Sequence, residues 1–259
     1  MGERAVKTIK GAAAALSYIL IYFLVIYLTE IEAFLFEADT VNASGITTIV
    51  SIFAAFLIYD VTFDLRGTPK KDVYSISAPK TLDVIFSVTM AAGFRMMTSA
   101  YMLWAENIKV LSESMESALN PEFNFETMTS FAAMTIIIAT CIAAPVFEEI
   151  LFRGIVMREL NMVMPAPLSI ILQGLFFGIV HFVLVQSIFA AVFGVILGYV
   201  YYKTKNLSIV MIAHIAFNMS SVLEIKDVSV FFIFIGALIT TLSVAMITYR
   251  HKNQLQQEL

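Results

Sequence analysis

Charged residues are scarce in this sequence. Of its 259 residues only 14% are charged, whereas 59% are hydrophobic, and the mean hydropathy is +0.86. Soluble domains carry about 25% charged residues and about half apolar ones. A chain with this balance has too much apolar surface for one soluble core. The composition therefore excludes a soluble globular protein and predicts a protein of the lipid bilayer.

Several patterns that mark familiar functions are also missing. Cys141 is the single cysteine, which excludes an internal disulfide. The sequence contains neither an HExxH motif nor a serine in a GxSxG-like turn, which argues against zincin and serine-hydrolase chemistry. Asp60, Asp64 and Asp83 lie near the ends of apolar runs and do not indicate an aspartic dyad. Basic residues are scattered over short loops, so we expect no nucleic-acid partner.

What the sequence does contain is a series of apolar runs of about 20 residues, the length that a membrane-spanning helix requires. These runs cover residues 12–29, 43–63, 82–104, 129–147, 207–223 and 228–249. The first run follows basic residues, as in a signal peptide, but it lacks a small-residue cleavage site, so we interpret it as a retained span. A further apolar region between Pro165 and Tyr202 is too long for one span. It predicts a hairpin of two spans with its turn near Gln186.

The number of basic residues alternates from loop to loop. Two of them, Lys109 and Lys226, lie in one set of loops, and thirteen lie in the other. The thirteen are Arg4, Lys7, Lys10, Arg66, Lys70, Lys71, Lys80, Arg153, Arg158, Lys203, Lys205, Arg250 and Lys252. Because basic residues concentrate in cytoplasmic loops, this alternation predicts eight helices with both termini in the cytoplasm. The expected fold is all-α, a polytopic membrane protein with a single transmembrane domain over residues 1–259.

Two adjacent glutamates follow the apolar run 129–147. Glu149 and Arg153 are four residues apart with the acid first, the spacing that pairs opposite charges on a helix. Glu148 is rotated by about 100° and lacks that partner. A carboxylate in a low-dielectric site becomes a better proton acceptor, as a general base requires. Pro145 is expected to bend the helix and free backbone carbonyls. The alternative is that the charges only mark the cytoplasmic end of the helix.

Two of the three histidines lie in apolar segments that we predict to be helical. Phe177 precedes His181 by four residues, and Asn218 follows His214 by four, so each pair shares a helical face. A phenylalanine beside an imidazole excludes water and favours the neutral ring, as a base requires. A histidine and an asparagine on one face offer two N–H donors, which suits an oxyanion hole. Counted from the predicted turns, the two histidines differ in depth by roughly 12 Å.

Glycines recur at four-residue spacing in the predicted hairpin. Gly174 and Gly178 share one helical face, and Gly194 and Gly198 repeat the spacing on the next helix. Small residues at this interval allow membrane helices to approach closely. The two helices of the hairpin are therefore expected to pack tightly against each other.

These residues together indicate hydrolysis of an amide without a covalent intermediate. A carboxylate can activate water, a second carboxylate is paired with an arginine, and a histidine with an asparagine can stabilise a developing oxyanion. Lone cysteines in membrane helices are usually small apolar fillers, so we give Cys141 no role.

The order of these motifs resembles that of the CPBP intramembrane protease family, which includes the CAAX prenyl endopeptidases and the bacteriocin-processing or abortive-infection proteins. The resemblance rests on Glu-Glu-x-x-x-Arg at 148–153, Phe-x-x-x-His at 177–181 and His-x-x-x-Asn at 214–218, within residues 145–219. It implies an eight-helix membrane enzyme whose central helices enclose a polar cavity open to the cytoplasm.

The resemblance also implies roles for these residues. Glu148 and His181 would hold and activate the attacking water, Glu149 and Arg153 would support the site, and His214 with Asn218 would stabilise the oxyanion. Phe177 is a candidate for substrate binding. We expect no cofactor, although two histidines and a glutamate also suit zinc. The expected partners are the lipid bilayer and a membrane-associated peptide or protein substrate, prenylated or not, and the expected location is a bacterial cell membrane.

Two other functions remain as alternatives. The first is a membrane scaffold or regulator that keeps the same fold and binds proteins without cleaving them; the complete set of polar residues argues against it. The second is a proton-coupled transporter that uses the glutamates and histidines as a relay. Inverted halves would support a transporter, and the sequence shows none.

Overall fold

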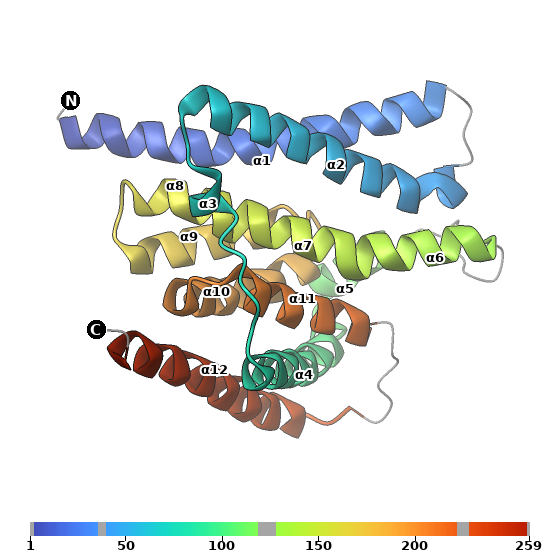
Figure 1. Cartoon of the computed structure of the whole chain (residues 1–259). Helices are drawn as coiled ribbons and strands as arrows, with labels where there is room; N and C mark the ends of the chain where they lie inside the picture. Colours follow the sequence, from blue (N-terminus) through green and yellow to red (C-terminus); the bar gives the residue numbers. More distant parts are fainter. Residues whose placement is uncertain (1–2, 36–39, 119–127, 222–227, 258–259) are drawn as a thin grey trace. The chain divides into compact units, whose positions relative to one another are not determined.

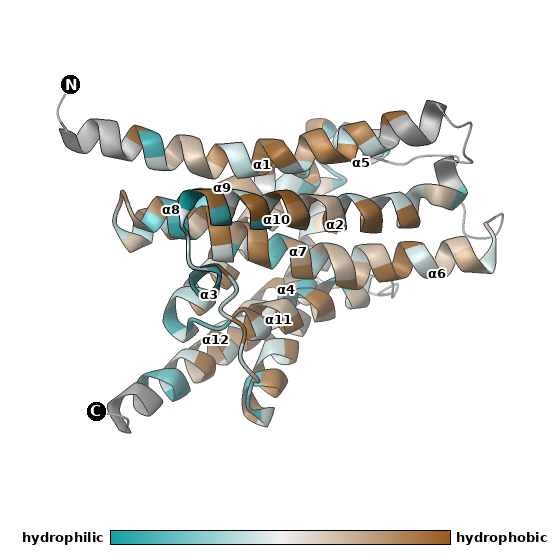
Figure 2. Cartoon of the chain, turned by 45° about the horizontal axis from the view of Figure 1, so that its top comes forward, coloured by the Kyte–Doolittle hydropathy of each residue, from teal (hydrophilic) through white to brown (hydrophobic). Residues whose placement is uncertain are grey.

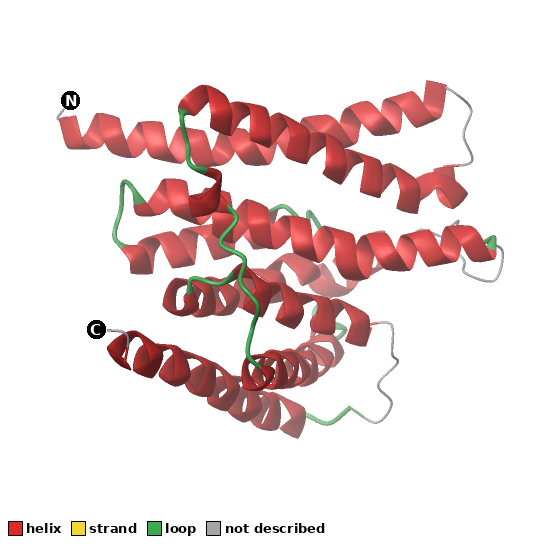
Figure 3. Cartoon of the chain, viewed as in Figure 1, coloured by secondary structure: helices red, strands yellow, loops and turns green. Residues whose placement is uncertain are grey.

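The computed structural model describes residues 3–35, 40–118, 128–221 and 228–257, and within these ranges the chain is helical without a β-strand (Figure 3). The all-α expectation is therefore confirmed. Lys226 and the predicted end of the span 207–223 lie outside the described residues. The chain divides into two compact units, Met1–Ser75 with Asn120–Pro165, and Ile76–Leu119 with Ala166–Leu259. We call them the first and the second unit and describe each by itself; a single transmembrane domain stays a prediction.

The first unit is built from two long helices and one long segment that changes helix type (Figure 1). Its elements are α1 (Glu3–Leu35), α2 (Thr40–Arg66), the short α3 (Lys70–Val73), α6 (Ser130–Ile138), η1 (Ala139–Ala143), α7 (Ala144–Glu149), η2 (Ile150–Val156) and α8 (Met157–Asn161). Helix α1 packs on α2, and α2 packs on α6. Phe147 lies at the centre of this packing, with its ring 4.6 Å from that of Tyr22 and 5.1 Å from that of Phe56.

One end of the first unit carries a cluster of charged side chains. Figure 2 shows hydrophilic residues gathered where α2 ends and α3 and α8 lie, while the middle parts of the long helices are hydrophobic. Arg66 donates to the carboxylate of Glu159 at 2.9 Å and to the hydroxyl of Tyr18 at 3.0 Å. Lys70 pairs with Asp60 at 2.9 Å. This end therefore has the charge expected at a membrane surface.

The helix around Pro145 contains two π-helical segments, η1 and η2. Proline has no N–H to donate to the carbonyl one turn earlier. Directly before it, the N–H of Ala144 bonds the carbonyl of Ala139, five residues back, which is the π-helical pattern. The disturbance that we predicted for Pro145 thus takes the form of a changed helix type. Single π-helical turns inside α-helices are frequent at functional sites.

The second unit contains six helices. They are α4 (Thr81–Ala105), α5 (Lys109–Ala118), α9 (Ala166–Ile179), α10 (Leu184–Thr204), α11 (Leu207–Ser221) and α12 (Phe231–Gln257). Helix α4 packs against α11 and α12, and α9 packs against α10. The backbones of α4 and α12 approach closely where two glycines face each other. A Cβ atom added to Gly93 would lie only 2.8 Å from the carbonyl oxygen of Gly236. At one end, Arg250 of α12 bonds the buried Asp83 of α4 at 3.2 Å.

Helices α9 and α10 form the predicted hairpin, but its turn is not where we placed it. The turn covers residues 180–183, so the prediction near Gln186 is wrong by several residues. Phe182 adopts a left-handed conformation with φ of 56°. Phenylalanine is uncommon in that conformation, and no glycine, proline or asparagine marks the turn. The sequence therefore carries no signal for its position.

The helices support a multi-pass membrane protein. Among the described residues, five helices are long and apolar enough to cross a membrane: Ile9–Thr29, Asn42–Arg66, Ser130–Asn161, Leu184–Thr204 and Phe231–Lys252. Helices α9 and α11 are apolar but shorter. Each of the eight predicted spans contains a helix in its described part. The number of crossings and the cytoplasmic position of both termini stay predictions.

Candidate active site

Glu149 and Arg153 form a buried ion pair in the first unit. Nη1 of Arg153 donates to Oε1 of Glu149 at 2.9 Å, and neither side chain is exposed. The spacing of four residues predicted this pair, and it is present even though Arg153 lies in the π-helical η2. Burial of a charge is costly unless it is paired, so each of these two residues stabilises the charged form of the other.

Glu148 lies at the end of α7 and is half-buried. Its carboxylate is close enough to the hydroxyl of Tyr22, on α1, and to the guanidinium of Arg153 for electrostatic interaction. We expected Glu148 to lack the influence of Arg153. The hydrogen bond does go to Glu149, but the positive charge acts on both carboxylates, because adjacent residues are only about 100° apart around a helix.

In the second unit, His181 lies in the turn after α9 rather than inside an apolar helix, so that part of our prediction is wrong. The displaced turn is the reason. Its Nδ1 atom is 2.7 Å from the carbonyl oxygen of Phe177, at the C-terminal end of α9. A carbonyl oxygen can only accept, so Nδ1 carries the proton in this contact. A neutral His181 then has its lone pair on Nε2, where it can accept a proton from water.

His214 is buried in α11, at the centre of an aromatic cluster within the second unit. Its ring centroid lies 5.6 Å from that of Phe177 and 5.6 Å from that of Phe193, both edge-on. Asn218 follows one helical turn later and is half-buried. The shared face that we predicted for His214 and Asn218 is therefore present, because residues four apart on an α-helix lie above one another.

Phe177 connects the two histidines. Its ring centroid is 5.0 Å from the ring of His181 and 5.6 Å from that of His214. Both imidazoles contact one phenyl ring, so the two histidines belong to one cluster within the second unit. The difference in depth that we expected from the sequence stays a prediction. Phe177 itself is only 1% exposed, and its ring packs against both imidazoles within the second unit. Its contact with a substrate stays a prediction.

The predicted site residues thus form two groups, one in each unit. Glu148, Glu149 and Arg153 are together in the first unit, and the two histidines with Asn218 are together in the second. The approach of one group to the other stays a prediction. Within either unit, no three described His, Cys, Asp or Glu side chains are close enough to hold a metal ion. Zinc held by residues of both units stays an alternative.

The aspartates have structural partners within their units. Asp60 bonds Lys70 and Tyr74, each at 2.9 Å, and Asp83 bonds Arg250. Hydrogen bonding to Asp60 raises the pKa of the exposed Lys70 ammonium, which keeps that pair charged at neutral pH. None of these contacts is an aspartic dyad, which agrees with their positions near helix ends.

One charged residue of the second unit, Arg95, was not among the residues predicted from the sequence. Arg95 lies in the middle of α4 and is half-buried. Its neighbour Phe94 stacks on Phe193 at 4.7 Å, and Phe193 contacts His214. Our count of basic residues considered loops only, whereas Arg95 lies inside the predicted span 82–104. A charge at the centre of an apolar run was the signal that could have found it.

Comparison with known proteins supports the resemblance found in the sequence. No curated protein and no solved structure shows significant similarity to this chain. A family model described as type II CAAX prenyl endopeptidase Rce1-like matches residues 130–220, the stretch that contains all three motifs. The predicted resemblance is confirmed over this stretch: residues 130–220 are similar to the Rce1-like type II CAAX prenyl endopeptidase family.

Proposed function

We propose that the protein is an intramembrane endopeptidase that cleaves a membrane-associated peptide or protein with water activated by Glu148 and His181. The observation that carries this proposal is the pairing of both histidines with Phe177 inside a stretch that matches a protease family. It brings together two imidazoles, His181 in the turn after α9 and His214 in α11, one to accept a hydrogen bond from water and one to donate to the oxyanion.

The proposed reaction begins with the attacking water. Glu148 takes one proton from it, and Nε2 of His181 accepts a hydrogen bond from the other. The hydroxide adds to the carbonyl carbon of the scissile peptide bond, and the carbonyl oxygen becomes an anion. N–H groups of His214 and Asn218 donate to this oxygen. When the intermediate collapses, the C–N bond breaks and the proton held by Glu148 passes to the leaving amine.

Glu149 and Arg153 have a supporting role in this proposal. Their direct bond fixes the carboxylate of Glu149 beside Glu148, and we assign the exchange of a proton with water to Glu148. The positive charge of Arg153 also acts on Glu148. We propose that the site faces the cytoplasmic side of a bacterial membrane, because the loops expected there are rich in basic residues.

The test compares membranes from cells that express the wild type, Glu148→Gln or Glu113→Gln. Glu113 is an exposed glutamate of α5, so its substitution makes the same chemical change on the surface. Sequencing of new peptide termini in the membrane fraction should show products that depend on Glu148 and persist in the Glu113 variant. Equal products in all three samples, at equal expression, would contradict proteolysis.

Two further measurements separate the alternatives. A scaffold would keep its cellular effect in the Glu148→Gln variant, whereas a protease would lose it. A proton-coupled transporter would acidify proteoliposomes when its substrate is supplied. Treatment of purified protein with a chelator, followed by zinc, decides metal dependence: the metal-free reaction that we propose should continue without zinc.

A further inference from the structure

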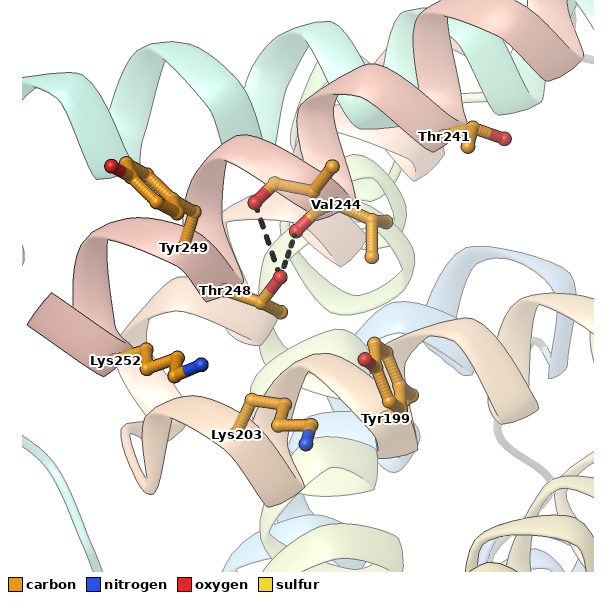
Figure 4. A pocket seen from close by; sticks show the side chains of 8 residues that line it. Tyr199, Lys203, Thr241, Val244, Thr248, Tyr249 and Lys252 are labelled. Carbon is orange, nitrogen blue, oxygen red and sulfur yellow. Dashed lines mark hydrogen bonds between the residues drawn. The ribbon is translucent and has the colours of Figure 1, made fainter.

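A cavity lies between α10 and α12, and no residue of the three motifs lines it. Its volume is about 620 Å³, and it belongs to the second unit alone. Figure 4 shows Tyr199 and Lys203 projecting from α10, opposite residues of α12. The lining residues of α12 are Thr241, Val244, Ala245, Thr248, Tyr249 and Lys252. The proposed peptidase reaction uses none of these residues.

One end of this cavity is cationic. Lys203 and Lys252 lie together at that end in Figure 4, and none of the described residues that line the cavity is acidic. The ammonium of Lys203 lies 5.5 Å from the ring centroid of Tyr199. Such a contact holds the lysine in place without neutralising its charge. This end of the cavity therefore offers two positive charges to an anion.

The other end is apolar and extends along α12 to Thr241 and Val244. The hydroxyl of Thr248 donates to the carbonyls of Val244 and Ala245 within the helix, at 2.9 and 3.1 Å, so its proton is already used. From Lys252 to Thr241 the helix rises about 16 Å, roughly half of a hydrocarbon core. The cavity thus changes from cationic to apolar along its length.

Its position matches the boundary between membrane and water. The apolar spans Leu184–Thr204 and Phe231–Lys252 both end at the cationic end of the cavity. Lysines and tyrosines concentrate at this level, where they meet lipid headgroups. A ligand that fits must carry a negative group beside the lysines and an acyl chain along the apolar wall. We propose that this cavity binds an anionic phospholipid, with the phosphate at Lys203 and Lys252 and one acyl chain against α12.

Native mass spectrometry of the full-length protein, released from nanodiscs, tests this proposal. The discs contain phosphatidylglycerol or phosphatidylcholine. The wild type should retain phosphatidylglycerol in preference to phosphatidylcholine. The Lys203→Gln/Lys252→Gln variant should lose about 30-fold in retention, because each lysine contributes about 1 kcal/mol to binding of anionic lipid.

The matched control is Lys71→Gln/Lys109→Gln, which removes the same charge from two exposed lysines that do not line the cavity. It should keep the lipid. Equal loss in both double variants would show general surface attraction and overturn the proposal, as would equal retention of both lipids. Competition by millimolar inorganic phosphate would assign the cavity to a soluble anion and would overturn it as well.

A second variant tests the apolar end without changing the charge. Ala245→Phe fills the cavity beside the proposed acyl chain, on an exposed position of α12 where folding tolerates a larger side chain. It should lower retention of phosphatidylglycerol while the melting temperature stays near that of the wild type. Full retention in this variant would exclude an acyl chain from the cavity.

Discussion

The guanidinium of Arg153 bonds the carboxylate of Glu149 at 2.9 Å in the first unit, where neither side chain is exposed. Removal of one partner leaves the other as a buried charge, whereas removal of both leaves none. The two kinds of substitution should therefore differ in stability, even though both abolish the ion pair.

We predict that Arg153→Met destabilises the protein by about 3 kcal/mol or more, because it removes the ion-pair partner of the buried Glu149. The double variant Glu149→Leu/Arg153→Met should be clearly more stable than this single variant. The free energy of unfolding of each purified variant in detergent tests both expectations. If the double variant unfolded as easily as the single one, hydrogen bonds to other partners would outweigh the buried charge.

We predict that neutral His181 carries its proton on Nδ1, because that atom faces the carbonyl of Phe177 at 2.7 Å. Nitrogen-15 spectra of protein labelled in the histidine rings distinguish the two tautomers. The His181→Gln variant identifies the signal that belongs to this residue. A proton on Nε2 at neutral pH would contradict the proposed acceptor role of that atom.

We predict that Phe177→Leu lowers peptide cleavage by roughly 10- to 100-fold, because small displacements of positioned groups have effects of this size. The substitution removes the ring that contacts both imidazoles. Phe176→Leu, at the half-buried neighbouring position, is the control and should retain cleavage. Equal rates for the two variants, with similar melting temperatures, would show that Phe177 does not orient the histidines.

We predict that Gly174→Ala destabilises the packing of α9 on α10 by about 1–3 kcal/mol. A Cβ atom there would lie 2.5 Å from Cγ2 of Val195 and 2.7 Å from its backbone nitrogen. The control is Leu175→Ala, at an exposed position of the same helix. Thermal unfolding should show a larger loss for the glycine variant. The opposite order would mean that α10 moves to accommodate the methyl group.

Much of the helical fold could be predicted because a long apolar run in lipid has few stable backbone conformations. Every backbone polar group must be satisfied within the segment, so such runs become helices. The close approach of α9 and α10 followed from glycine spacing: a Cβ atom on Gly194 would lie 2.9 Å from Cα of Gly174. The Glu149–Arg153 pair followed from a spacing of four residues.

The position of the turn between α9 and α10, and with it that of His181, depends on a backbone conformation that the amino-acid sequence does not indicate. Phe182 adopts a conformation that glycine or asparagine usually marks, so the turn and the position of His181 were misplaced. The contact of Phe177 with both histidines requires that turn. Arg95 was overlooked for a different reason, because a rule about loop charges does not consider charges inside a span.

The π-helical segments on both sides of α7 affect how this helix can change in evolution. A π-helical turn holds one residue more than an α-helical turn of similar height. Deletion of a single residue from Ala139–Ala143 would restore a regular helix without loss of backbone bonding. It would leave Glu148 near its present direction, because the π-helical turn and the α-helical turn that replaces it each complete about one full rotation. A single deletion could therefore change the helix type before the acidic pair while the direction of the pair is kept.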